Sequence, residues 1–223
     1  MLEKIFVSPK PLDKEKDRDL RVRPLNNFKH ASSINLVPIY AGEAREACKT
    51  YPVVFVKDIN GFMPIIITGH KEGVNNYVDK SGAWKEGAYV PALIRSYPFA
   101  VAENEGNSFI VYDSNYKGFA KDGEAIFTED GELSELGQKI SKNVSEVFSA
   151  LTFTSELFKG IEDLFKQSDM NIQRDGATYK ISQLQIIDEE KFAKIDKDRL
   201  EELKEKKILP IIYQHLLSLN NRV

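Results

Sequence analysis

The chain changes its apolar periodicity about halfway along, and this change limits the folds that it can adopt. The first half holds β-branched runs, Val53–Val56 and Met63–Thr68, on either side of Asp58-Ile59-Asn60-Gly61, whose Asn-Gly pair indicates a hairpin turn. From Leu136 on, apolar residues recur every three or four positions, as on one face of a helix: Leu136, Ile140, Val144, Val147, Phe148 and Leu151. Strands followed by helices predict an α+β fold rather than a doubly wound parallel sheet.

The first half is predicted to be mainly an antiparallel sheet, with further strands at Leu2–Val7 and Ser108–Asp113. The second half is predicted to be mostly helical. Ser134 is placed to cap the helix that begins near Leu136. A second apolar stripe follows Thr154, a second candidate cap, and predicts either one long kinked helix or a helix pair: Leu157, Phe158, Ile161, Leu164 and Phe165.

One late strand is expected at Thr178–Ile187. The alternation between inward-facing and outward-facing side chains changes its phase near Gln183, which predicts a bulge there. Asp188 and Asp196 are placed to cap two short helices, and Pro210 stands at the first turn of a last helix. No change in composition forces a division, so we expect a single domain over residues 1–223. A boundary near Gly131 is the alternative.

Composition excludes several classes of protein. The net charge is −3, and acidic and basic residues are mixed along the chain, so nucleic-acid binding has little electrostatic support. The longest apolar runs are too short to cross a bilayer, and no apolar signal core follows Met1. These features predict a soluble, cytoplasmic protein without an integral membrane segment. A single cysteine, Cys48, rules out an internal disulfide.

The sequence carries no standard catalytic or cofactor motif. The three histidines, His30, His70 and His215, have no acid, histidine or cysteine at metal-ligand spacing, so we expect no metal site. The glycines form neither a P-loop nor Gly-x-Gly-x-x-Gly, and the serine nucleophile elbow is missing, so we expect no cofactor.

The most distinctive stretch is the aromatic, proline-bracketed segment Tyr89–Phe99. Pro91 can begin a short helix and Pro98 must end it. Leu93, Ile94 and Tyr97 would then face the core, and Arg95 would point elsewhere. The segment is interpreted either as a helical plug, with Arg95 paired to an acid, or as an anion or peptide-terminus site at Arg95. Tyr89 and Tyr97 would flank that site.

Three further residues are candidates for a site. His215 shares one face of the last helix with apolar residues, which is more typical of a hydrogen-bonded core histidine than of a catalytic base. Arg21 and Arg23 precede Pro24, beside Asp17 and Asp19. This grouping favours an ion-pair network over a binding site.

Several short motifs occur in the order found in the SapC family of bacterial proteins. They are Arg21-Val22-Arg23-Pro24-Leu25, Val37-Pro38-Ile39, Tyr51-Pro52-Val53-Val54-Phe55, the segment Tyr89–Phe99, and Leu209-Pro210-Ile211-Ile212-Tyr213-Gln214-His215-Leu216-Leu217-Ser218-Leu219. The chain resembles this family from about Ser8 to Leu219. The family is named for its association with surface-layer protein genes and their secretion machinery. The resemblance implies a surface-protein context and carries over no catalytic residue.

Three functions are compatible with the sequence. The favoured one is a non-catalytic accessory or adaptor protein whose partner is a surface-layer or secreted protein, or its secretion machinery. The second is an enzyme that modifies a peptide or small molecule, with an unmarked site near Arg95 and His215. The third is a structural subunit of a homo-oligomer.

Overall fold

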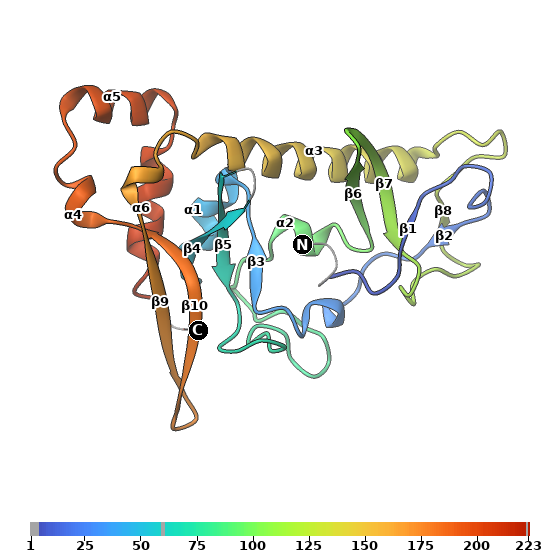
Figure 1. Cartoon of the computed structure of the whole chain (residues 1–223). Helices are drawn as coiled ribbons and strands as arrows, with labels where there is room; N and C mark the ends of the chain where they lie inside the picture. The colour runs from blue at the N-terminus through green and yellow to red at the C-terminus, as the bar shows by residue number, and fades with distance from the viewer. Residues whose placement is uncertain (1–4, 59–60, 222) are drawn as a thin grey trace.

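The computed structural model describes residues 5–58, 61–221 and 223. Three antiparallel sheets and one long helix organise the chain (Figure 1). The strands are β1 (Pro9–Pro11), β2 (Arg21–Val22), β3 (Leu36–Pro38), β4 (Val53–Asp58), β5 (Gly61–Ile67), β6 (Phe99–Asn104), β7 (Asn107–Asp113), β8 (Glu124–Ala125), β9 (Phe165–Arg174) and β10 (Ala177–Ile187). The α-helices are α1 (Ala44–Ala47), α2 (Ala92–Arg95), α3 (Glu135–Leu157), α4 (Glu189–Phe192), α5 (Lys197–Glu205) and α6 (Leu209–Ser218). Among the described residues, short 3₁₀ turns lie at Lys29–Ala31, Ala41–Glu43 and Glu162–Leu164.

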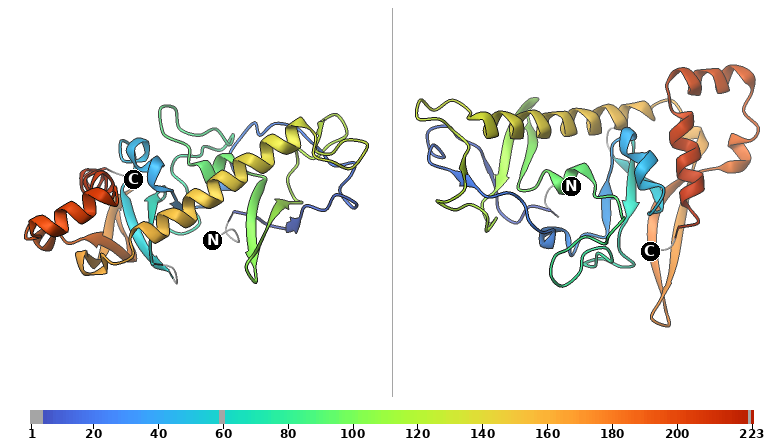
Figure 2. Two further views of the ribbon diagram at one scale, coloured as in Figure 1. Left: turned by 90° about the horizontal axis from the view of Figure 1, so that it is seen from above. Right: turned by 180° about the vertical axis from the view of Figure 1, so that it is seen from behind.

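The sheets are separated along the molecule. One has the strand order β1-β7-β6, the second β3-β5-β4-β10-β9, and the third β2-β8, with antiparallel pairing throughout. Helix α3 lies across the first two and contacts both β5 and β6 (Figure 2). The α+β class, the antiparallel sheet of the first half and the mainly helical second half are confirmed.

Most predicted boundaries in the second half are also confirmed. The hydroxyl of Ser134 accepts a hydrogen bond from the Gly137 amide and so caps α3. Asp188 and Asp196 cap α4 and α5, and Pro210 lies in the first turn of α6. The late strand is present as β10, and its register against β9 shifts between Ile181 and Leu184. Gln183 lies in this bulge with a φ of 62°.

The prediction of a helix beyond Leu157 was wrong. Gly160 adopts a φ of +83°, which ends helical geometry, and strand β9 begins at Phe165. Thr154 caps no helix. It lies buried inside α3, where its Oγ1 donates to the Ala150 carbonyl and accepts from the Ala41 amide. The apolar stripe that suggested a second helix is a turn packed into the core.

The N-terminal strand was also placed wrongly. Residues 1–4 lie outside the described part of the chain, and residues 5–7 form no strand; β1 is the first strand among the described residues. Ile5 and Phe6 are buried nonetheless. Strands β4 and β5 pair as expected, although the predicted turn at residues 59–60 lies outside the described residues.

The apolar core has separate parts that follow the sheets. The largest part joins the five-stranded sheet to α1, α2 and α6. A smaller one lies between the β6–β7 hairpin and the N-terminal half of α3, and contains Val22, Phe99 and Val144. The edge of this smaller core opens into the cleft described next.

Candidate functional site

A cleft of about 290 Å³ lies where the end of α2, the chain after β2 and the N-terminal half of α3 meet. Its lining consists of Val22, Arg23, Pro24, Leu25, Arg95, Ser96, Tyr97, Pro98, Phe99, Glu124, Leu136, Lys139, Ile140, Asn143 and Val144. Residues 136, 140 and 144 are four positions apart and therefore share one face of the helix. The floor is apolar, and the charged side chains stand at the rim. We call this feature the Arg95 cleft.

The segment Tyr89–Phe99 forms one wall of the Arg95 cleft and folds as predicted. Helix α2 occupies Ala92–Arg95, and Leu93, Ile94 and Tyr97 are buried while Arg95 is exposed. The amides of Ser96 and Phe99 donate to the carbonyls of Ala92 and Ser96. The backbone at the end of the short helix is therefore hydrogen-bonded within the segment itself, and Arg95 is the side chain of α2 that points outwards.

The predicted pairing of Arg95 with an acid was wrong. Its Nε donates to the Val90 carbonyl at 3.0 Å and its Nη2 to the Tyr89 hydroxyl at 3.3 Å. The guanidinium carbon lies 5.8 Å from the centre of the Tyr89 ring, in cation–π geometry. Among the described residues, no carboxylate lies within ion-pair distance of Arg95. The side chain is held in place by an aromatic ring and a backbone carbonyl instead.

A buried carboxylate that the sequence interpretation missed supports this arrangement. Glu43, only 3% exposed, accepts from the Tyr89 hydroxyl at 2.9 Å and from the Ala92 amide at 2.7 Å. Its second oxygen accepts from the Tyr40 amide at 3.0 Å. Burial raises the pKa of Glu43, and these hydrogen bonds offset only part of that effect. An acid three residues after Tyr40, the spacing of a capping box, was the available signal.

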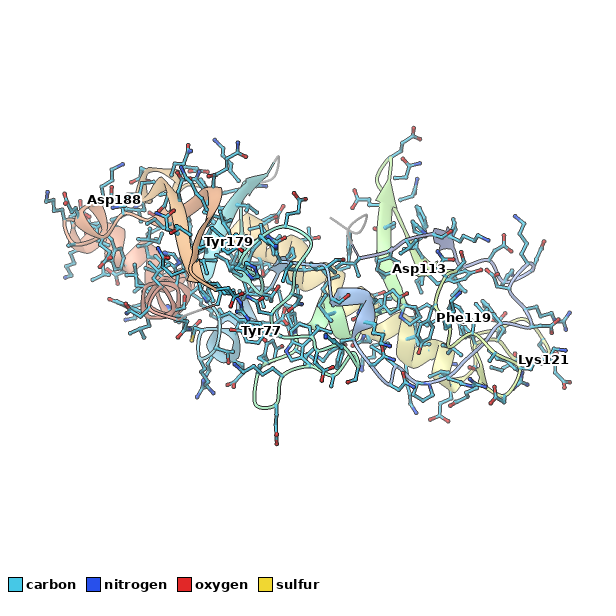
Figure 3. The ribbon with its side chains drawn as sticks, turned by 90° about the horizontal axis from the view of Figure 1, so that it is seen from below. Tyr77, Asp113, Phe119, Lys121, Tyr179 and Asp188 are labelled. Atoms are coloured by element: carbon cyan, nitrogen blue, oxygen red, sulfur yellow. The ribbon has the colours of Figure 1, made fainter. Side chains whose placement is uncertain are left out.

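Tyr97 presents its ring to the cleft and turns its hydroxyl inwards. The hydroxyl donates to Asp113 at 3.1 Å, and the ring stacks on His30 at a centroid distance of 3.9 Å. Burial lowers the pKa of His30 to about 4, although the Ile94 carbonyl bonded to its ring favours the charged form. Asp113, labelled in Figure 3, is the last residue of β7. Tyr97 therefore ties the cleft wall to the core.

The two predicted arginines near β2 have different positions. Arg23 stands at the cleft rim and binds Asp122 through two bonds, Nε to Oδ1 at 2.9 Å and Nη2 to Oδ2 at 2.7 Å. Arg21 lines a different cavity and donates to the Gly123 carbonyl at 3.0 Å. The expected network with Asp17 and Asp19 was therefore wrong, since the acid that pairs with Arg23 comes from a distant loop.

His215 lies in the core and takes no part in the Arg95 cleft. Its Nε2 accepts from the Ile187 amide at 3.1 Å, so its Nδ1 carries the proton and donates to the Val53 carbonyl at 2.6 Å. Burial lowers the pKa of His215 to about 4, and the Val53 bond opposes this only in part. The preferred interpretation of a hydrogen-bonded core histidine agrees with these contacts.

The structure thus brings together Arg95, Tyr97 and Arg23 in one cleft, with Tyr89 against Arg95, and leaves Arg21 and His215 elsewhere. Within the described ranges, no group of three or more potential ligands could hold a metal ion. No helix in those ranges combines the length and apolar character needed to span a bilayer.

The fold and the site define an α+β protein in which one long helix bridges two antiparallel sheets beside a cleft with an apolar floor and charged side chains of both signs at its rim. The model of the SapC family matches residues 12–222, so the chain belongs to the SapC family. Comparison with the curated proteins and with the solved structures gives no match.

Proposed function

We propose that this chain is a non-catalytic accessory or adaptor protein, acting in the cytoplasm, that binds a surface-layer or secreted protein or its secretion machinery through the Arg95 cleft. The observation that carries the proposal is the cleft itself, because it gathers three of the candidate residues beside an apolar floor. Arginine and aromatic side chains are the usual anchors of protein interfaces. Membership of the SapC family supports the surface-protein context.

The chemistry of the rim favours binding over catalysis. Arg23 is held by Asp122, and Lys139 is held by Glu135 at 2.6 Å. The hydroxyl of Tyr97 is directed at Asp113 rather than into the cleft. The enzymatic alternative needs Arg95 and His215 in a shared site, and His215 uses both ring nitrogens inside the core.

Site-specific photo-crosslinking in the native host tests the proposal. A photoreactive amino acid is placed at position 139, which lines the cleft, and in a second strain at position 142 as the matched control. The side chains of Lys139 and Lys142 are 71% and 77% exposed on the same helix, but Lys142 does not line the cleft. We expect crosslinks to a surface-layer, secreted or secretion protein from position 139 alone. Equal products from both positions would contradict the proposal.

A homo-oligomeric role remains a second candidate because large apolar side chains stand on the surface away from the Arg95 cleft. Phe153 is 61% exposed and Leu217 is 72% exposed. Association with a second copy of the chain would remove such side chains from water. Sedimentation at working concentrations distinguishes the candidates, since a subunit of a homo-oligomer must sediment above the mass of one chain.

A further inference from the structure

We infer that the Arg95 cleft recognises an Asp or Glu side chain that stands next to a large apolar side chain in a partner segment. The carboxylate binds the guanidinium of Arg95, and the apolar side chain enters the floor of the cleft. This inference rests on the proposed function and names the chemistry of the partner.

Arg95 has donors left for a carboxylate. A guanidinium carries five N–H groups, and the two bonds to Val90 and Tyr89 use the edge formed by Nε and Nη2. The outer edge, formed by Nη1 and the second N–H of Nη2, is not engaged by any described residue. Two parallel N–H groups on that edge match the two oxygens of a carboxylate.

The Arg95 side chain is also held in position before binding. The Val90 carbonyl and the Tyr89 hydroxyl fix one edge, and the Tyr89 ring lies against the guanidinium. Tyr89 is itself fixed by Glu43. A side chain that is already ordered loses less entropy on binding, so the site is preorganised for a ligand.

The other cations at the rim are already neutralised. Asp122 binds Arg23 and Glu135 binds Lys139. Glu124 also lines the cleft and acts on Lys139, whose pKa it helps to raise. In the described part of the chain, Arg95 is thus the cation of the lining without a direct ion pair, and it reaches the buried Glu43 through the Tyr89 hydroxyl. An acid in the partner complements this exposed charge.

The floor sets the second requirement. Val22, Leu25, Leu136, Ile140 and Phe99 surround a volume of about 290 Å³. This lies at the lower end of the roughly 300–1,000 Å³ found for small-molecule pockets. A single bulky apolar side chain suits this space better than a cofactor does.

The backbone around the cleft favours a side-chain carboxylate over a chain terminus. Sites that capture a C-terminal carboxylate use unpaired backbone N–H groups. Here the amides of Arg23, Ser96 and Phe99 donate to the carbonyls of Gly118, Ala92 and Ser96. These three amides are not available to an anion, and the outer edge of the Arg95 guanidinium offers two donors to a carboxylate.

A peptide titration followed by NMR tests this inference. The probes are acetylated, amidated hexapeptides that place Asp or Glu beside Leu, Ile, Phe or Met. The readout is the Nε–Hε resonance of Arg95. We expect at least one probe to shift this resonance and its Asn or Gln counterpart to bind about tenfold or more weakly, because bonds to a charged acceptor are the stronger ones.

Protein variants distinguish the contribution of the carboxylate contact to peptide binding from the contribution of the apolar floor. Arg95→Ala should abolish discrimination between the acidic probe and its amide counterpart, and Ile140→Gln should weaken both probes. Arg45→Ala, an exposed arginine outside the cleft, is the control and should change neither. Thermal melting checks folding, and Arg95→Ala should melt close to the wild type because its contacts are exposed.

Each result bears on one claim. The inference is overturned if no probe shifts Arg95, or if a peptide with only a free C-terminal carboxylate binds as tightly as the acidic probe. Crosslinks from position 139 that persist in the Arg95→Ala background would keep the adaptor role and reject carboxylate recognition. Peptide binding without any crosslinked surface or secretion protein would keep carboxylate recognition and reject the adaptor role.

Discussion

The hydroxyl of Tyr97 donates a hydrogen bond of 3.1 Å to Asp113, whose side chain has no exposure to solvent. The same carboxylate accepts from the amides of Val7 at 2.9 Å, Ser8 at 3.0 Å and Asn115 at 3.1 Å. One buried carboxylate therefore joins the start of the described chain, the end of β7 and the wall of the Arg95 cleft.

Replacement of Asp113 should destabilise the fold. Asp113→Ala leaves the buried Tyr97 hydroxyl and three part-buried amides without an acceptor, so the free energy of unfolding should fall by about 2–4 kcal/mol. Urea unfolding followed by circular dichroism measures this. Asp122→Asn is the control, because Asp122 is exposed and its solvent-screened pair with Arg23 should contribute far less. If the free energy of unfolding fell equally in the two variants, the prediction that the contacts of Asp113 stabilise the fold more than an exposed ion pair would be contradicted.

Glu43 should give stability an unusual pH dependence. Burial raises its pKa, so the folded chain holds this proton more tightly than the unfolded chain does. The stability of the wild type relative to Glu43→Gln should therefore decrease as the pH rises above about 4.5, the ordinary value, and level off above the raised pKa. Parallel urea titrations between pH 4 and pH 7 measure the difference. A difference that grows with pH would mean that the pKa of Glu43 is lowered instead.

His215 should contribute stability that is complete above pH 6.5 and lost as the pH falls towards 4. The reason is that its folded pKa of about 4 lies below the ordinary value of 6.5, so protonation favours the unfolded chain. His215→Gln should remove this slope, which for one proton is at most about 1.4 kcal/mol per pH unit. At neutral pH it should cost about 1–3 kcal/mol, because Val53 or Ile187 loses its partner.

The pH effect of His215 can be separated from that of His30. His30 also has a pKa lowered to about 4 and loses stability in the same range. The slope left in His215→Gln should therefore decrease further in the double variant with His30→Gln, and what remains includes the opposite contribution of Glu43. If His215→Gln alone showed the slope of the wild type, His215 would not titrate as its burial requires.

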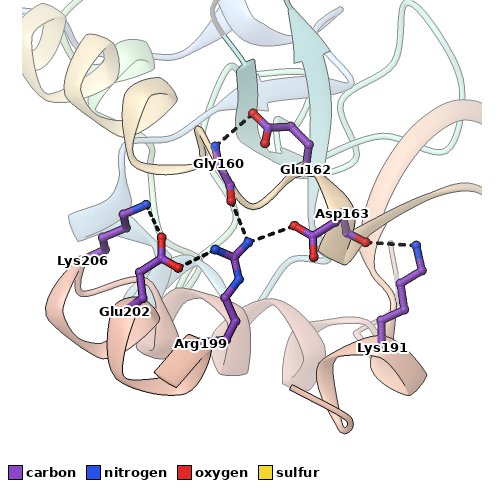
Figure 4. Close-up of polar contacts among 7 residues, drawn as sticks. All are labelled: Gly160, Glu162, Asp163, Lys191, Arg199, Glu202 and Lys206. Carbon is purple, nitrogen blue, oxygen red and sulfur yellow. Dashed lines mark hydrogen bonds and ion pairs between the residues drawn. The ribbon is translucent and has the colours of Figure 1, made fainter. Parts of the chain in front are cut away.

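Arg199 connects α5 to the turn before β9. These contacts require a forked guanidinium, because they go to several partners at once. Its Nη2 donates to the Gly160 carbonyl at 2.6 Å and to Asp163 at 2.9 Å, while Nη1 pairs with Glu202 (Figure 4). Arg199→Lys keeps the charge but loses the fork, so we expect a loss of about 1 kcal/mol. It should also speed proteolysis near α5. Lys197→Arg on the same helix is the control, and a matching loss there would remove the special role of Arg199.

Elements with a clear periodicity could be predicted, and those set by backbone geometry or pairing could not. The helix after Ser134 and the bulge at Gln183 follow from the spacing of apolar residues. Strand β9 carries mainly polar side chains and exists because it pairs with β10, so no local pattern marked it. The apolar residues after Leu157 have helical spacing, but the positive φ of Gly160 overrides it.

The site could be predicted only in part. The short helix between Pro91 and Pro98 follows from local proline rules, and the helical spacing of its apolar residues placed Arg95 on the outside. The surroundings of this short helix could not be predicted in the same way. They depend on Glu43, nearly fifty positions earlier, and on a face of α3 that begins about forty positions later. Contacts over such separations leave no trace in the spacing of one sequence.

Because α3 is one uninterrupted helix that contacts two sheets, insertions and deletions within it should not be tolerated. One added residue would turn one end of the helix by about 100° and move it by about 1.5 Å relative to the other end. The contacts with β6 near one end and with β5 near the other could not both survive that rotation. Insertions and deletions in relatives should therefore collect in the loops, while the stretch from Glu135 to Leu157 keeps its number of residues.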